Sequence, residues 1–423
     1  LGNYDAARRH IQELPQSSDG LKDFLALELD TLQALSLSGG VPAKTGAELV
    51  ARMQALSLDS LTPEQLRREA TYALALGAPV VAAPIYEVLA AREPEKKTEW
   101  LTEAAKWHMA ASESERAALI YQQLLADEQV AEKRLDLIQQ AVMALRGAGR
   151  ESQAAEFLAG HLSELSGDDS ILLDEGFHAA LGSNRYDLAE KFVQLWREQQ
   201  PQDMQAIKAE FDLRMASSDI VAAWPLGNML VDNDPENPEL LRTMGMLGEW
   251  VGNSVEALDY WERLLALEED PVIREHSWRL AAQLFEFERA IPLLVTLSEM
   301  RQLTTEELDA LVYSYESLGE PEEEEQWLRS YLKAQPNQQL AWVRLQQLLE
   351  RTQQFQAETE AWAQLDKRFG LSPADRVSWA QTHWKLFDED AAWRVMAAKN
   401  ANAEKITDPE YWRVRAELAW ITE

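Results

Sequence analysis

The residue types that most often carry out chemistry are sparse and scattered in this sequence. Its 423 residues contain six histidines and no cysteine. The histidines are His10, His108, His161, His178, His276 and His383. No two of them lie within four residues of each other, whereas zinc hydrolases place two histidines one helical turn apart. We therefore predict that the chain holds no catalytic metal.

Two further patterns resemble chemical motifs only superficially. The run Gly147-Ala148-Gly149-Arg150 resembles a phosphate-binding loop, but no lysine followed by serine or threonine comes after it. We predict a turn between two helices there. Carboxylate pairs, which serve as acid and base in glycosidases, indicate no particular site because 72 residues are acidic. With no constellation of acid, base and nucleophile, we expect no enzyme and no cofactor, and an enzyme built on a helical solenoid stays the alternative.

The charge of the chain excludes some ligands. Lysine and arginine number 40, so the net charge is −32, of which residues 1–200 carry −12 and the remainder −20. Nucleic acid is bound by clustered basic residues, and we therefore expect no nucleic-acid partner. No apolar run approaches the roughly 18 residues that span a bilayer. The start Leu1-Gly2-Asn3-Tyr4 does not resemble a signal peptide, so we expect targeting information to lie upstream.

The elements that must position any site recur along the whole chain. Repeat starts fall near residues 21, 63, 98, 135, 170, 204, 238, 272, 305, 339, 373 and 408. After the first interval the spacing is 33 to 37 residues. Apolar residues at intervals of three and four predict one apolar stripe on each helix. Small residues such as Ala82, Ala189, Gly245 and Ala257 would let neighbouring helices approach closely.

This pattern resembles the tetratricopeptide repeat (TPR), a helical hairpin of 34 residues. The best stretches run from Gly77 to Pro94 and from Asn184 to Pro201. The resemblance implies an all-α fold, a right-handed α-solenoid of about twelve TPR-like helical hairpins. In such a solenoid the first helix of each hairpin, helix A, lines the concave wall, and the second, helix B, forms the outside.

We expect residues 1–423 to form a single array. It would consist of a half repeat at 1–20, an irregular repeat at 21–62, regular repeats at 63–407 and the start of a further repeat at 408–423. The poorest segment is 38–47, where three glycines and a proline predict an irregular loop or a displaced hairpin. Because neither end shows a capping helix, we expect the natural protein to continue in both directions.

The A helices of the later repeats carry the candidate binding surface. Counting along these helices places the following side chains toward the concave wall: Glu239, Glu249, Trp250, Glu306, Asp309, Glu316, Glu350 and Trp384. An acidic groove attracts a cationic ligand, and an exposed tryptophan contacts a partner or stacks on a sugar ring. Alternatively, the acidic residues only keep the protein soluble. Arg242 and Arg351 also point toward the concave wall, which favours this second interpretation. Both interpretations stay open.

The divergent, acidic, tryptophan-rich repeats are similar to the periplasmic scaffolds of the PelB family of outer-membrane exporters of the Pel exopolysaccharide. That resemblance implies a non-catalytic periplasmic scaffold, with membrane association only through regions absent from this chain. It implies as partner a PelA-like polysaccharide deacetylase/hydrolase, whose product is a cationic polysaccharide guided toward an outer-membrane pore. The alternative is a cytoplasmic TPR adaptor for protein-complex assembly or regulation.

Overall fold

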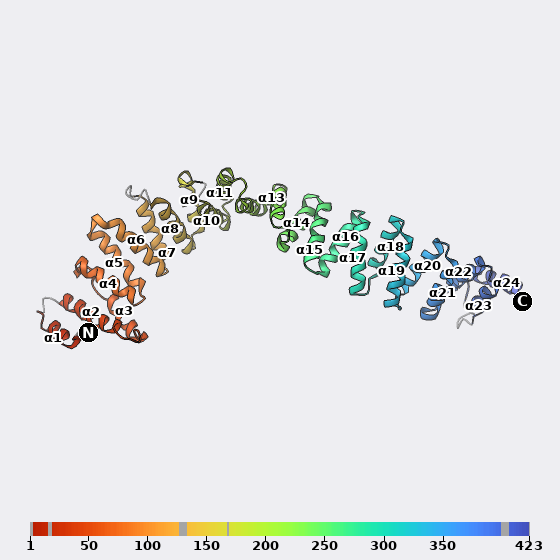
Figure 1. Ribbon diagram of the computed structural model, residues 1–423, viewed down its shortest axis with the longest axis horizontal. Helices are drawn as coiled ribbons and strands as arrows, with labels where there is room; N and C mark the ends of the chain where they lie inside the picture. Colours follow the sequence, from red (N-terminus) through yellow and green to blue (C-terminus); the bar gives the residue numbers. More distant parts are fainter. Residues whose placement is uncertain (1–2, 16–18, 127–132, 167–168, 399–405, 423) are drawn as a thin grey trace. The chain divides into compact units, whose positions relative to one another are not determined.

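Helices are the regular elements throughout the residues that the computed structural model describes, which are 3–15, 19–126, 133–166, 169–398 and 406–422. The chain divides into two units, Leu1–Leu230 (unit 1) and Val231–Glu423 (unit 2). Within each unit the helices follow one another as antiparallel hairpins in chain order (Figure 1). Among the described helices, none is long and apolar enough to cross a membrane.

Unit 1 holds the first twelve helices, and α13 (Ile220–Asn233) spans the boundary between the units. The helices are α1 (Tyr4–Gln12), α2 (Asp19–Leu35), α3 (Ala43–Gln54), α4 (Pro63–Ala75), α5 (Pro79–Arg92), α6 (Lys97–Ala110), α7 (Ser114–Leu125), α8 (Arg134–Gly147), α9 (Glu151–Ala159), α10 (Ser170–Gly182), α11 (Tyr186–Gln199) and α12 (Met204–Ala216).

Unit 2 holds the remaining helices. They are α14 (Pro238–Val251), α15 (Ser254–Leu267), α16 (Pro271–Gln283), α17 (Phe287–Met300), α18 (Thr305–Leu318), α19 (Pro321–Ala334), α20 (Gln339–Arg351), α21 (Phe355–Phe369), α22 (Pro373–Lys385), α23 (Glu389–Ala397) and α24 (Pro409–Thr422). Each of these helices packs against the next one along the chain.

The predicted all-α solenoid of TPR-like hairpins is confirmed. From α4 onward the even-numbered helices are A helices, and each starts within one residue of a start predicted between 63 and 408. Local chemistry fixes several of these starts. Proline occupies the first turn of α14, α16 and α22, where its missing N–H costs nothing. Capping boxes begin α18 (Thr304 with Glu307) and α22 (Ser372 with Asp375).

Each turn from helix A to helix B contains one residue with a left-handed backbone. These turn residues are Gly77, Ser112, Gly149, Asn184, Ser218, Gly252, Phe285, Gly319, Gln353 and Phe387. The next amide donates back to helix A, as Asn253 N–H does to Gly248 O at 2.7 Å, which ends the helix in a Schellman motif. Gly149 shows that the run at 147–150 forms the predicted turn. Glycine adopts this conformation without strain, so the two phenylalanines are conformational outliers.

We define the inner position as the fifth residue after the turn residue. In nearly every hairpin the side chain at this position is small. It is alanine at Ala82, Ala117, Ala154, Ala189, Ala223, Ala257, Ala290 and Ala392, and glutamate at Glu324 and Glu358. All eight alanines are fully buried, as expected where two helices approach closely. The two glutamates therefore place carboxylates where the repeat otherwise accepts only a methyl group.

The N-terminal region departs from the regular spacing. Helix α2 runs from Asp19 to Leu35, and α3 begins only at Ala43. The predicted irregular segment at 38–47 is therefore non-helical only as far as Pro42, because residues 43–47 form the start of α3. Parts of the predicted half repeat at 1–20, namely residues 1–2 and 16–18, lie outside the described residues.

Gly245 offers a test of the close contact between A and B helices. A Cβ atom at Gly245 would lie 2.5 Å from Cε2 of Trp261, which is buried. We expect Gly245→Ala to lower the free energy of unfolding by about 1–3 kcal/mol, because a rigid indole has little room to yield. The measurement is urea unfolding followed by circular dichroism.

Gly182→Ala is the matched control, since a Cβ atom at this helical glycine meets nothing within 4 Å. It should leave the free energy of unfolding unchanged or raise it by roughly 0.5–1 kcal/mol. Equal unfolding midpoints for the two variants would contradict the proposed steric role of Gly245.

Candidate interaction surface

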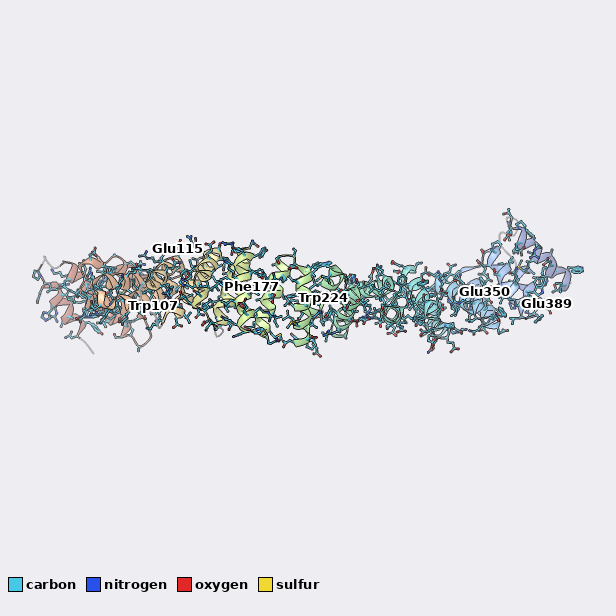
Figure 2. All side chains as sticks on the ribbon, turned by 90° about the horizontal axis from the view of Figure 1, so that it is seen from above. Trp107, Glu115, Phe177, Trp224, Glu350 and Glu389 are labelled. Carbon is cyan, nitrogen blue, oxygen red and sulfur yellow. The ribbon has the colours of Figure 1, made fainter. Side chains whose placement is uncertain are left out.

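The exposed sides of α14, α16, α18, α20 and α22 form what we call the helix-A face of unit 2. All eight candidate side chains belong to these helices, and Glu350 is labelled on α20 in Figure 2. Glu239, Glu306, Glu316 and Glu350 are exposed, whereas Glu249 and Asp309 are half-buried. The acidic side chains therefore reach solvent to different degrees, and their hydrogen-bond partners decide which of them are free.

Four of the candidate carboxylates are paired with a cation of the neighbouring A helix. The pairs are Glu306 with Arg279, Asp309 with Arg344, Glu316 with Arg351 and Glu350 with Lys385. In three of them the partners stand 35 residues apart, which is one repeat. Exposed pairs of this kind contribute about 0–1 kcal/mol each. The helix-A face is therefore a ladder of ion pairs between hairpins rather than an uninterrupted strip of free carboxylates.

The two candidate carboxylates of α14 differ from these four. Glu249 Oε1 accepts a hydrogen bond from Trp261 Nε1 at 2.9 Å and lies 2.8 Å from His276 Nε2. Glu249 thus ties α14 to α15 and α16. Glu239 stands in the first turn of α14, is exposed, and has no side-chain partner among the described residues. Glu239 is consequently the free carboxylate of the candidate set.

The two candidate tryptophans also differ. Trp250, in the last turn of α14, has 62% of its surface exposed. Trp384 is half-buried against the C-terminal core, which includes Val377, Met396 and Tyr411. Most of the Trp384 surface therefore stabilises the last hairpins, and Trp250 is the one of these two tryptophans that the helix-A face presents to a ligand.

Arg351 joins the ladder to a buried acid. It forms an ion pair with Glu316, and its Nη2 donates to Glu324 Oε2 at 2.9 Å. Glu324 is 1% exposed, and its other oxygen, Oε1, has no partner among the described residues. Burial raises the pKa of Glu324 to about 7 against the opposing effect of Arg351, and Glu316 adds to the rise.

The second inner glutamate, Glu358, is the centre of a hydrogen-bond network. Its Oε1 accepts from Gln346 Nε2 at 2.9 Å, Trp362 Nε1 at 3.1 Å and Thr382 Oγ1 at 2.9 Å. The donors come from α20, α21 and α22. Since a buried carboxylate needs such donors, this network ties two consecutive hairpins together.

Other polar clusters have structural explanations. His108 is buried, with Nε2 2.8 Å from Glu87 Oε1 and Nδ1 2.6 Å from Glu113 Oε2. Although burial opposes ionisation, hydrogen bonds from Arg116 and His108 lower the pKa of Glu87. Within the described part of the chain, no group of three or more His, Cys, Asp or Glu residues is arranged to hold a metal ion.

Sequence reasoning missed an aromatic group at the turn between α16 and α17. The rings of Phe285 and Phe287 lie 6.1 Å apart, and Tyr313 of α18 lies 5.6 Å from Phe287, both contacts edge to face. Phe285 is 73% exposed. A signal was present in the sequence, because Phe285 and Phe387 occupy the turn position that Gly252 and Gly319 occupy in other hairpins.

Comparison with known proteins gives a family match near the C-terminus. A family model described as tetratricopeptide repeat matches residues 364–423. Among curated proteins, none matches this sequence. The family match and the repeated hairpins together support a TPR-type scaffold for protein interaction.

Several solved structures are similar to parts or most of the chain. A structure of Naa15/Naa10 bound to HypK-THB has 10% identity and a TM-score of 0.43, covering 95% of this chain and 69% of that chain. A tetratricopeptide repeat protein from Parabacteroides merdae has 11% identity and a TM-score of 0.27, with 60% and 99% covered. YrrB, described as a TPR protein with an unusual peptide-binding site, has 16% identity and a TM-score of 0.35, with 44% and 95% covered. These TM-scores are all below 0.5, so we assign the architecture from the helices of this chain alone.

The raised pKa of Glu324 predicts a pH dependence of stability. Its pKa is about 7 in the folded chain and near the ordinary value of 4.5 in the unfolded chain, so the unfolded chain releases this proton first. The contribution of protonated Glu324 to the free energy of unfolding is fully present below pH 4.5 and is lost as the pH rises to about 7. The free energy of unfolding falls by at most about 3 kcal/mol over this range. Glu324→Gln cannot ionise and should lack this fall.

The measurement is urea unfolding of both proteins between pH 4.5 and 8. Glu69 in unit 1 is also buried, with a pKa raised to about 7 chiefly by burial, but it is present in both proteins and cancels in the comparison. Parallel pH profiles for the two proteins would show that Glu324 is ionised in the folded chain at all these pH values.

Proposed function

We propose that this protein is a non-catalytic scaffold that docks its ligand on the helix-A face of unit 2. The observation that carries the proposal is one stripe along α14. Glu239, Met246 and Trp250 follow each other at intervals of seven and four residues, which places them on the same side of the helix. All three side chains are exposed. The stripe thus presents a free carboxylate, a thioether and an indole over about 16 Å of helix.

We further propose that the ligand is a cationic polysaccharide and that the scaffold also docks a PelA-like polysaccharide deacetylase/hydrolase in the periplasm. A partly deacetylated amino-sugar polymer carries ammonium groups, which Glu239 attracts, and sugar rings, which stack on the exposed face of Trp250. The net charge of −32 favours such a polymer over an anionic one. The chain's resemblance to repeat scaffolds of exopolysaccharide exporters supports the same proposal, with the outer-membrane tether in a region outside this chain.

A cytoplasmic adaptor for protein assembly is the second candidate. Trp250 and Met246 favour it equally, because exposed tryptophan and methionine side chains also bind apolar segments of proteins.

The two candidate functions place the protein in different compartments of the cell. Fractionation of cells that produce the full-length protein should recover it from the periplasm, and recovery from the cytoplasm would reject the export proposal.

A charge-reversal pair tests the polymer-binding face. Glu239→Lys with Glu306→Lys reverses two exposed carboxylates of the helix-A face while leaving the better-buried pair of Asp309 and Arg344 intact. We expect binding of a glucosamine oligomer, followed by tryptophan fluorescence, to weaken roughly fivefold to tenfold, because Glu239→Lys replaces attraction by repulsion and Glu306→Lys leaves Arg279 without its carboxylate partner beside a second cation.

The control reverses two carboxylates that lie on B helices. Glu299 of α17 and Glu360 of α21 are exposed and have no partner among the described residues. Glu299→Lys with Glu360→Lys therefore changes the net charge equally and should leave binding nearly unchanged. An equal loss in both double variants would mean that the oligomer responds to total charge and that the helix-A face is not its site.

A further inference from the structure

The turns from helix A to helix B in unit 2 form a second surface, which we call the turn edge. It consists of residues 252–256, 285–288, 319–323, 353–356 and 387–390. All A helices of a repeated hairpin run in the same direction, so their turns lie along one edge of the unit. The turn edge is distinct from the helix-A face, because its side chains project from the ends of the hairpins.

Two phenylalanines of the turn edge are held in a costly conformation and point into solvent. Phe285 has φ 62° and Phe387 has φ 58°, and they are 73% and 87% exposed. A bulky L-residue in the left-handed region is an outlier that glycine would relieve. Neither burial nor backbone geometry explains a phenylalanine at these two positions. Strain of this kind points to a use for the side chain.

A third phenylalanine of the turn edge, Phe355, already has a cation over its ring. The ammonium group of Lys385 lies 5.0 Å from the centre of the Phe355 ring and 3.3 Å from Glu350 Oε1. A lysine from the next A helix thus sits between a ring and a carboxylate. Phe287 occupies the same repeat position as Phe355, but the counterpart of Lys385 is Ser317, so the chain supplies no ammonium group there.

The charges around these rings favour a cation from outside the chain. The five turn segments contain no lysine or arginine. Among the described residues, the following turn carboxylates have no side-chain partner: Glu256, Glu286, Glu288, Glu320, Glu322, Glu323, Glu389 and Asp390. Glu389 is labelled in Figure 2.

Unit 1 provides the contrast. At three of its turns an arginine pairs with an acid of the neighbouring hairpin, in the pairs Arg116 with Glu87, Arg150 with Glu115 and Arg185 with Glu156. Free carboxylates beside exposed rings are therefore a property of the turn edge of unit 2 and not of the repeat in general.

We propose that the turn edge of unit 2 docks a lysine-rich segment of a partner protein, with ammonium groups over the rings of Phe285, Phe287 and Phe387 and beside the neighbouring carboxylates. The occupant is a protein because the internal example is a lysine, whose four-carbon stem packs along a ring while the ammonium reaches a carboxylate. An amino sugar carries its ammonium directly on the ring and lacks that reach. The proposal rests on the scaffold function for the existence of a partner, but it uses a different surface.

The test measures the binding of a fluorescein-labelled peptide of eight lysines to the full chain by fluorescence anisotropy at physiological salt. Phe285→Gly combined with Phe387→Gly should weaken binding about fivefold to tenfold, because two cation–π contacts are lost without any change in net charge. Glycine is the relaxed residue at these turns, so the double variant should keep its thermal unfolding midpoint. A loss of binding together with intact stability separates a binding role from a structural one.

Gln353→Gly is the matched control, since Gln353 has the same left-handed backbone (φ 57°) without a ring, and peptide binding should be unchanged. Trp250→Ala removes an exposed ring of the helix-A face and should also leave peptide binding unchanged. The peptide experiment therefore tests the turn edge independently of whether a ligand binds the helix-A face. Unaltered peptide binding by the double phenylalanine variant would overturn the docking proposal. A glucosamine oligomer that loses affinity in the double variant as strongly as the peptide does would overturn the assignment to a protein segment.

Discussion

The close approach of helix A to helix B is the constraint on which the rest of the structure depends. A hairpin of two amphipathic helices cannot bury its apolar stripes alone, so each hairpin must pack on the next at short distance. This short distance requires small residues between helices A and B. Eight fully buried alanines at the inner position and Gly245 next to the Trp261 indole meet this requirement. Close packing fixes the rotation of each helix, and the rotation decides which side chains face solvent, which face the next hairpin and which stand at the turns.

Two hairpins lack the small residue at the inner position, and both lie beside the candidate surface. Glu324 and Glu358 replace alanine in two consecutive hairpins, and each requires donors from neighbouring helices to offset its desolvation. The donor for Glu324 is Arg351, which also belongs to the ladder of ion pairs. Buried polar groups and exposed ion pairs therefore form one network in this part of unit 2. Among the candidate carboxylates, ion pairs therefore hold those of α18 and α20, and Glu239 of α14 stays unpaired.

The sequence alone predicted the helices well, but it did not predict how the side chains on them pair. Helix starts follow from local signals such as Pro238 and the Thr304 capping box, which need no knowledge of distant residues. The ion pairs join residues one repeat apart, as Asp309 and Arg344 do, and depend on helix rotations that periodicity gives only approximately. The same imprecision explains Trp384, which was predicted on the concave wall and lies half-buried against the C-terminal core. Phe285 and Phe387 were overlooked because a turn residue is recognised by glycine, and these turns have none.

The acidity of the chain has a different meaning in different places. On the helix-A face most carboxylates are balanced by a cation one repeat away, so their number says little about the field that a ligand meets. At the turns of unit 1 arginines balance the neighbouring acids in the same way. The turn segments of unit 2 contain no lysine or arginine of their own, and an ammonium group that approaches the turns at Phe285 and Phe387 meets unpaired carboxylates and exposed rings. The net charge of −32 therefore matters for recognition where pairing is absent, and at Glu239 and the turn edge unpaired carboxylates stand beside exposed aromatic rings.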